Sequence, residues 1–151
     1  MRVSELMSRH VVTIGLGETC DEAVARMVRW KVRHLPVLAE DGSVRGVVTD
    51  RDLRHHLFAP GVFRQVGSRP LDQLLKERPV RDVMSAPAIC VSAVADLEDA
   101  AGLMRQYRIG SLPVLEGDRV AGILTETDLL RHIVRAEDRT GPELEIIVSY
   151  P

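Results

Sequence analysis

The sequence has 151 residues, of which 45% are hydrophobic, and a formal net charge of −2 at pH 7. A chain of this length buries roughly 68–70% of its unfolded surface, which excludes a wholly disordered protein. No apolar run approaches the roughly 18 residues of a membrane span, and the polar N-terminus "MRVSELMSRH" lacks the pattern of a signal peptide. We therefore expect a cytoplasmic protein without a membrane partner, and the acidic charge balance argues against nucleic-acid binding.

The first half of the sequence predicts one folded unit within residues 1–58. It begins with a short apolar strand at residues 11–14. An amphipathic helix follows, because apolar residues recur at helical spacing; they are Cys20, Ala23, Val24, Met27 and Val28. A strand containing "LPVL", a Gly/Asp turn and a strand at residues 44–48 come next, and a closing helix begins after Thr49.

Polar residues mark the start of the amphipathic helix. Thr19 and Glu22 have the spacing of a capping box, in which side chains satisfy free backbone N–H groups of the first turn. Asp96 and Asp99 stand at the matching places later in the chain. The pattern therefore predicts a side-chain cap at Thr19.

A linker at residues 59–78 follows the first unit. Proline and glycine residues predict a loop in its first part, and "PLDQLLKE" (residues 70–77) predicts a short helix with proline at its start. The tail at residues 135–151 is acidic at first and then contains "LEIIVSY", whose composition is typical of a strand.

The unit at residues 79–134 repeats the first. "VSELMSRHVVTI" returns as "VRDVMSAPAICV", "HLPVL" as "SLPVL", and "GVVTDRDL" as "GILTETDL". Each copy therefore predicts a β-α-β-β-α unit. Because a unit of about 55 residues is marginal for an independent core, we expect an α+β, α/β sandwich-like fold. In it the two units pack with pseudo-two-fold symmetry and leave a cleft on each side of their contact.

With these motifs present twice and in the same order, the sequence resembles a tandem pair of cystathionine-β-synthase (CBS) domains. The likeness rests on "LMS…VVTI", "RHLPVL" and "GVVTDRDL" with their second copies, and "TDRDL" with "TETDLL" is similar to stand-alone CBS proteins of the acetoin-utilisation type. The resemblance implies a regulatory module that is not an enzyme and requires no cofactor. It implies an adenosine-containing ligand, first AMP, ADP or ATP, with S-adenosylmethionine or NAD-type molecules as alternatives.

The resemblance also implies macromolecular contacts. CBS pairs often form homodimers, so ligand binding would change the dimer geometry or the affinity for a regulated protein partner. The alternative is a dimerisation or protein-interaction module whose clefts stay empty.

No Gly-x-Ser-x-Gly, P-loop, His-Glu-x-x-His or GxGxxG motif occurs, and Cys20 and Cys90 form no metal-binding motif. We expect neither catalysis nor a metal site.

The Thr-x-x-Asp pattern has two compatible interpretations. It occurs as Thr49 with Asp52 and as Thr125 with Asp128. The Thr hydroxyl can cap the following helix, and the acidic residue suits the positive helix end. The family resemblance implies in addition that both Asp carboxylates bind ribose hydroxyls, since a carboxylate offers two acceptors to two donors. It implies that both Thr side chains contact ribose or phosphate.

The resemblance assigns the remaining site residues by copy. The first strand of each copy would form the wall of a base pocket, and the proline of each "LPVL" would shape a second wall. Ordinary strand packing and edge-strand prolines explain the same residues. The first predicted site consists of Val11, Val12, Thr13, Pro36, Thr49, Arg51 and Asp52. The second predicted site consists of Ile89, Cys90, Pro113, Thr125, Thr127 and Asp128.

The copies differ where phosphate contacts are expected. The residue between Thr and Asp is Arg51 in the first copy and Thr127 in the second. By resemblance, Arg33 and His34 reach across to the phosphate bound by the other copy; a solvated strand end explains them equally well. An arginine can fork onto phosphate oxygens. Arg51 would then serve the first site and Arg33 or His34 the second, so we predict two clefts that bind phosphate unequally.

Overall fold

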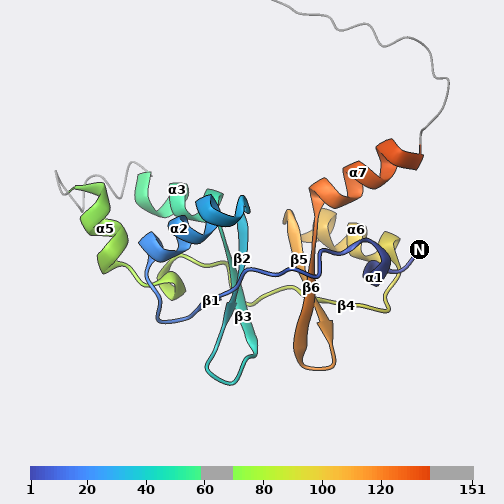
Figure 1. Cartoon of the computed structure of the whole chain (residues 1–151), viewed down its shortest axis with the longest axis horizontal. Coiled ribbons are helices and arrows are strands. Elements are labelled where there is room, and N and C mark those ends of the chain that lie inside the picture. Colours follow the sequence, from blue (N-terminus) through green and yellow to red (C-terminus); the bar gives the residue numbers. More distant parts are fainter. Residues whose placement is uncertain (59–69, 137–151) are drawn as a thin grey trace, which may run out of the picture.

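A computed structural model of the chain describes residues 1–58 and 70–136 and contains two similar α+β halves side by side (Figure 1). Each half holds a three-stranded sheet, with a parallel first pair and an antiparallel second pair. The first sheet has the order β1 (Ile14–Gly15), β2 (His34–Leu38), β3 (Val44–Thr49). The second sheet has the order β4 (Val91–Ser92), β5 (Ser111–Glu116), β6 (Arg119–Thr125).

Helices pack against both sheets and confirm the predicted α+β fold of two β-α-β-β-α units. The first half contains α2 (Cys20–Trp30), α3 (Asp50–Phe58) and α5 (Leu71–Glu77). The second half contains α6 (Leu97–Tyr107) and α7 (Glu126–Ala136). Helix α5 confirms the short helix predicted in the linker, whereas the loop at residues 59–69 and the "LEIIVSY" strand lie outside the described residues. None of the helices described in the two ranges is long and apolar enough to cross a bilayer.

Two short helices were not predicted, and each lies in the half opposite its own copy. They are α1 (Val3–Leu6) and the 3-10 helix η1 (Val80–Asp82). Val3 is fully buried in the core of the second half, and Val80 is fully buried in the core of the first. Each core is therefore completed by residues of the other copy, and the sequence repeat does not coincide with the packing unit.

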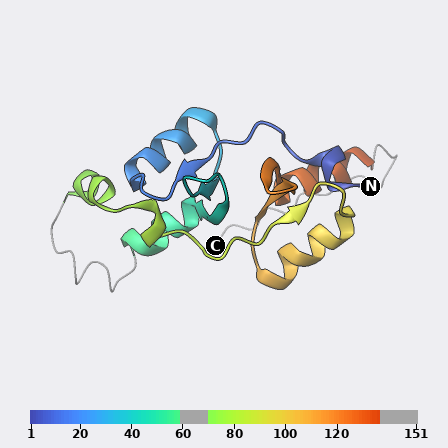
Figure 2. The ribbon, with the colours of Figure 1, turned by 90° about the horizontal axis from the view of Figure 1, so that it is seen from below.

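The first strand of each unit begins later than predicted. The apolar runs predict strands at residues 11–14 and 88–91, but β1 and β4 begin at Ile14 and Val91. The residues before them cross between the halves (Figure 2) and belong to no strand ladder, apart from the single residues Ser8 and Ser85. We call residues 8–13 and 85–90 the crossing segments.

Each crossing segment docks on the last strand of the opposite half. Ser8 exchanges backbone hydrogen bonds of 2.9 and 3.0 Å with Ile123 of β6, and Ser85 exchanges bonds of 3.0 and 2.9 Å with Val47 of β3. The docking on β3 requires glycine at position 46, because a Cβ atom there would lie 2.7 Å from the carbonyl oxygen of Ser85. Backbone therefore meets backbone at these two places, and this contact positions the segments that follow.

Pro36 and Pro113 are fully buried in the middle strands β2 and β5, which corrects the prediction that they line a ligand site or occupy an edge. Val47 directs its backbone N–H and C=O to Ser85, so it forms a non-hydrogen-bonded pair with Pro36. The proline nitrogen consequently faces the side of β1. Strand β1 pairs only from Val37 onward, so no ladder bond is lost at the proline.

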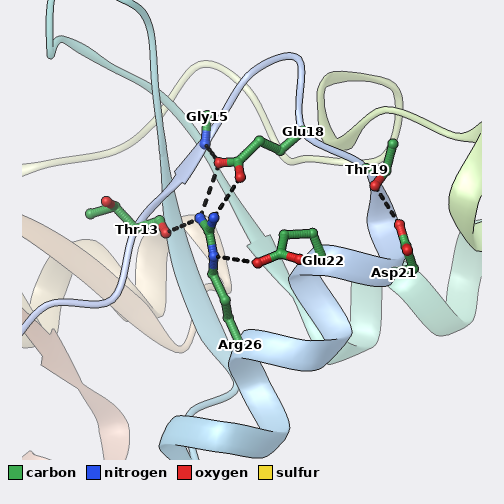
Figure 3. A network of polar contacts seen from close by, with 7 residues as sticks. All are labelled: Thr13, Gly15, Glu18, Thr19, Asp21, Glu22 and Arg26. Carbon is green, nitrogen blue, oxygen red and sulfur yellow. Dashed lines mark hydrogen bonds and ion pairs between the residues drawn. The ribbon is translucent and has the colours of Figure 1, made fainter.

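The capping box predicted for α2 is wrong. Thr19 is the N-cap residue, but its side chain makes no capping bond and instead contacts the carboxylate of Asp21 (Figure 3). Glu22 forms an ion pair with Arg26 at 3.1 Å. Asp96 likewise makes no side-chain cap at the start of α6. A charge-assisted bond is stronger than a neutral one, so the Arg26 guanidinium takes the carboxylate that a capping box requires.

Fewer residues of α2 are buried than its apolar sequence pattern predicts. Cys20, Ala23 and Met27 are buried, but Val28, predicted on the same stripe, is 74% exposed. The three strands of the first sheet cover only part of the helix surface, so the outer edge of the predicted stripe faces solvent.

Candidate functional site

Two pockets lie where the halves meet. The first, which we call the Asp52 pocket, has a cavity volume of about 480 Å³. The second, the Asp128 pocket, has a volume of about 340 Å³. Both volumes lie within the range of roughly 300–1,000 Å³ that is usual for small-molecule sites.

Each pocket combines residues from both copies, which corrects the predicted grouping. Ala88 and Ile89 of the second copy line the Asp52 pocket. Val11 and Val12 of the first copy line the Asp128 pocket, with Thr125, Thr127 and Asp128. The reason is the exchange of the crossing segments, which carries each apolar wall to the helix start of the other copy.

Thr49 and Asp52 form a complete capping box, which confirms the cap interpretation. Asp52 Oδ2 accepts the Thr49 backbone N–H at 2.9 Å, and Thr49 Oγ1 accepts the Asp52 backbone N–H at 3.0 Å. The other carboxylate oxygen, Oδ1, accepts the hydroxyl of Ser85 at 3.1 Å. Both oxygens of Asp52 are thus already hydrogen-bonded within the protein, one of them to the opposite crossing segment.

Thr125 and Asp128 form the equivalent cap but leave one oxygen open. Asp128 Oδ2 accepts the Thr125 backbone N–H at 2.9 Å and the Thr125 hydroxyl at 2.7 Å. Ser8, the counterpart of Ser85, donates instead to the carbonyl oxygen of His10 at 3.4 Å. Among the described residues, Asp128 Oδ1 therefore has no hydrogen-bond partner and is available to a ligand in its pocket.

A single wall separates the two pockets. Arg33, His34, Gly110 and Glu126 line both of them. A Cβ atom on Gly110 would lie 3.3 Å from Cε1 of His34 and 3.4 Å from the Glu126 carboxylate. Glycine therefore lets the two copies approach closely at this wall, and a ligand in either pocket would meet the same side chains.

His34 contributes a neutral, polar ring to this wall. Its Nδ1 atom is buried and has no hydrogen-bond partner within the described part of the chain. Burial lowers the pKa of His34, an effect that the nearby Asp50 carboxylate only partly opposes. The ring is consequently uncharged near pH 7, and Arg33 is the charged member of the predicted pair.

The residues predicted to contact phosphate all line a pocket, but Arg33 and His34 line both pockets and not the Asp128 pocket alone. Arg51 lines the Asp52 pocket, and Arg33 and His34 reach the Asp128 pocket from the other copy. Neither Arg51 nor Arg33 takes part in a salt bridge among residues 1–58 and 70–136. Both guanidinium groups therefore remain available to an anion.

Sequence reasoning missed four further basic residues. Arg54 and Arg108 line the Asp52 pocket, and Lys31 and Arg131 line the Asp128 pocket. Lys31 and Arg108 could have been found by aligning the copies, because each ends the amphipathic helix of its unit. Both have the left-handed backbone that follows a helix, with φ of 53° and 54°. Arg54 differs from the others because it pairs with Asp50 at 3.3 Å.

Besides Pro36 and Pro113, two further predicted residues, Thr13 and Cys90, lie outside both pockets. Thr13 borders a separate hollow beside Arg26, and its carbonyl oxygen accepts a hydrogen bond from that side chain. Cys90 is half-buried, and burial raises the pKa of its thiol, as it also raises the pKa of Cys20 to about 11. In the part of the chain that the structure describes, no three His, Cys, Asp or Glu side chains gather as metal ligands would.

A family model described as CBS domain matches this chain twice, at residues 3–59 and 80–135. A CBS domain-containing protein of Dictyostelium discoideum is 31% identical over 142 residues, which are 93% of this chain and 97% of that protein. An uncharacterized protein of Methanocaldococcus jannaschii is also 31% identical, but this chain covers only 34% of its length.

Solved structures are similar over nearly the whole chain. A Vibrio cholerae protein named for acetoin utilization superposes with a TM-score of 0.70 and 27% identity, covering 90% of this chain and 92% of that one. The structure of a protein called CBSX2 in complex with AMP has a TM-score of 0.70 and 26% identity, covering 90% of this chain and 98% of that one.

Proposed function

The chain belongs to the CBS-domain family as a tandem pair, and on this premise we propose that it is a regulatory module that binds adenosine nucleotides in the Asp52 and Asp128 pockets. The observation that carries the proposal is the shared composition of the two pockets. Each places an acidic helix start opposite an apolar crossing segment and beside arginine side chains. The AMP complex of a relative with 26% identity supports the same ligand class.

The Asp128 pocket illustrates how its groups match the parts of a nucleotide. The open Oδ1 of Asp128 can accept a ribose hydroxyl. Val11 and Val12 offer an apolar surface to a base, and their backbone groups lie outside any strand ladder. The start of α7 and the guanidinium of Arg33 favour a phosphate, because a helix N-terminus carries partial positive charge.

The two pockets are proposed to differ in phosphate preference. The Asp52 pocket is larger, at about 480 Å³ against about 340 Å³. It also carries Arg51, where the Asp128 pocket carries the uncharged Thr127. We therefore expect the Asp52 pocket to favour ATP over AMP more strongly than the Asp128 pocket does.

Thermal melting tests the proposal. AMP, ADP, ATP, S-adenosylmethionine and NADH are titrated in parallel, with GTP as a control for the base. A ligand at 100 times its dissociation constant is expected to add about 2.7 kcal/mol to the free energy of unfolding. Unshifted melting curves for the whole panel would contradict ligand binding and favour a protein-interaction module with empty clefts.

We further propose a homodimer formed through α7. Three apolar side chains of this helix are exposed at helical spacing: Leu130 at 61%, Ile133 at 52% and Val134 at 70%. The helix is acidic in its first turn and basic in its last. An antiparallel pair of such helices about a two-fold axis places each acidic turn opposite the partner's basic turn, which favours a second copy of the chain.

This contact would connect ligand binding to assembly. Asp128 and Arg131 of α7 line a pocket, while Leu130 and Val134 of the same helix face outward. A ligand shifts the dimer equilibrium only if it binds the two states with different affinity. A helix shared by the pocket and the dimer contact provides a direct physical route for that difference.

Light scattering after size exclusion tests the dimer. The Leu130→Glu and Val134→Glu double variant is expected to reduce the mass to that of one chain, 16.8 kDa, because two carboxylates cannot be buried unpaired. Val28→Glu, at a position 74% exposed on α2, is the control and should leave the dimer intact. A wild-type protein that is monomeric at high concentration would refute the α7 dimer.

A further inference from the structure

A cluster of polar contacts joins α2 to the chain just before β1 (Figure 3). The Nη1 atom of Arg26 donates to the carbonyl oxygen of Thr13 at 2.8 Å and to Oε2 of Glu18 at 3.0 Å, and Nη2 donates to the other oxygen of Glu18. Glu18 Oε2 also accepts the backbone N–H of Gly15 at 2.7 Å. Arg26 Nε donates to Glu22 at 3.1 Å. We call these five residues the Arg26 cluster.

The cluster is charged at neutral pH. Burial alone would raise the pKa of Glu18, but the backbone N–H of Gly15 and the Arg26 guanidinium together lower it. An ionised carboxylate facing a forked guanidinium makes two directional bonds at once. Nη1 of Arg26 also donates to the Thr13 carbonyl, so the backbone at that point is bound to α2 rather than to a strand.

Thr13 is the last residue of the crossing segment that forms the apolar wall of the Asp128 pocket. Val11 and Val12, which line this pocket, directly precede it. At the other end of the segment, Ser8 is bonded to Ile123. The wall between these two points has no strand neighbour. Val12 packs against the core of the first half and His10 contacts Trp30, so the backbone hydrogen bonds of the segment are concentrated at its ends.

The second copy lacks the cluster. Aligning the repeats places Leu103 at the position of Arg26, Ala95 at that of Glu18 and Cys90 at that of Thr13. Leu103 and Ala95 instead pack against the core of the second half. The crossing segment that lines the Asp52 pocket is therefore bonded to β3 at Ser85, but no arginine among the described residues binds the backbone at its other end, at Cys90.

We propose that Arg26 is a positioning residue that holds the apolar wall of the Asp128 pocket in its ligand-binding arrangement, with no counterpart at the Asp52 pocket. A wall that is ordered before binding lowers the entropic cost of binding. The effect on nucleotide affinity rests on the proposed function, whereas the ordering of the wall does not. The Asp128 pocket is accordingly the more rigid of the two.

Hydrogen exchange of the ligand-free protein tests the ordering. Arg26→Leu introduces the residue of the second copy and is expected to speed amide exchange in residues 10–15 while leaving residues 86–91 unchanged. Arg26→Lys keeps the charge but loses the fork and should give an intermediate rate. Arg105→Leu removes an exposed arginine from α6 and is the charge-matched control. Exchange in residues 10–15 that matches the wild type would overturn the proposal.

Calorimetry with AMP and ATP tests the consequence for binding. In an Asp52→Ala background, which reports the Asp128 pocket, Arg26→Leu is expected to weaken binding roughly tenfold, equivalent to about 1.4 kcal/mol. In an Asp128→Ala background the same change should have no effect. Equal losses in both backgrounds, or none in either, would overturn a pocket-specific role. If the wild type binds neither nucleotide, the proposed function fails, and the exchange rates alone decide whether Arg26 orders the wall.

Discussion

A protein carrying both Asp52→Ala and Asp128→Ala is expected to lose measurable binding of AMP and ATP while keeping its fold. Each substitution removes the carboxylate proposed to accept ribose hydroxyls, and a hydrogen bond to a charged group contributes about 1.5–3 kcal/mol. Each also removes half of a capping box, which costs about 0.5–2 kcal/mol of stability. Calorimetry measures the binding, and circular dichroism at a temperature well below the melting transition verifies the fold.

The single variants are expected to differ. Both oxygens of Asp52 are already hydrogen-bonded to Thr49 and Ser85, whereas Asp128 keeps Oδ1 open. Asp128→Ala should therefore weaken binding in its own pocket more than Asp52→Ala does. Asp96→Ala is the matched control, because it removes a carboxylate from a helix start that lines neither pocket. Unchanged affinity in the double variant would refute the ribose assignment.

Gly46→Ala is expected to destabilise the protein by about 1–3 kcal/mol, the usual cost of inserting a methyl group into a closely packed contact. The new Cβ atom would lie 2.7 Å from the carbonyl oxygen of Ser85 and 2.8 Å from Sδ of Met84. The methionine can move, but the carbonyl belongs to the backbone pair that docks the crossing segment on Val47. Urea denaturation measures the loss as a lower transition midpoint at an unchanged slope.

The same substitution at Gly102 is the control, and its effect should have the opposite sign. No atom lies within 4 Å of a Cβ built at this position in α6, and alanine is favoured over glycine in a helix by about 1 kcal/mol. Gly102→Ala should therefore raise stability. If Gly46→Ala were as stable as the wild type, the crossing segment could not approach β3 as closely as the structure places it.

Local patterns in the sequence determined the elements and the fold class. Alternating and helical periodicity located β2, β3, α2 and their counterparts, and the internal repeat indicated two similar units. The pairing of Thr49 with Asp52 as a cap was also predictable, because both partners lie within one helical turn. These features depend on residues close together in the chain, which is why one sequence sufficed for them.

Contacts between distant residues were decided only by the tertiary structure. The apolar residues Val11, Val12 and Ile89 line pockets at a helix start, and only the exchange of the crossing segments reveals that each helix belongs to the other copy. Glu22 could cap α2 or pair with Arg26 at the i,i+4 spacing of a helical ion pair, and only the structure shows that the ion pair forms. Pro36 fits a middle strand without losing a ladder hydrogen bond because β1 pairs only from Val37 onward, which the sequence does not show.

The sequence by itself determined that two copies of one unit, each with an acidic helix start, make up this protein. Only the tertiary structure decided that each helix start faces the apolar wall of the other copy and that Arg26 binds one of those walls. The physical reason is that a half of this size cannot complete its own core, so Val3 and Val80 are buried in the opposite halves. The chain must cross between the halves to place them there, and the two pockets form along those crossings.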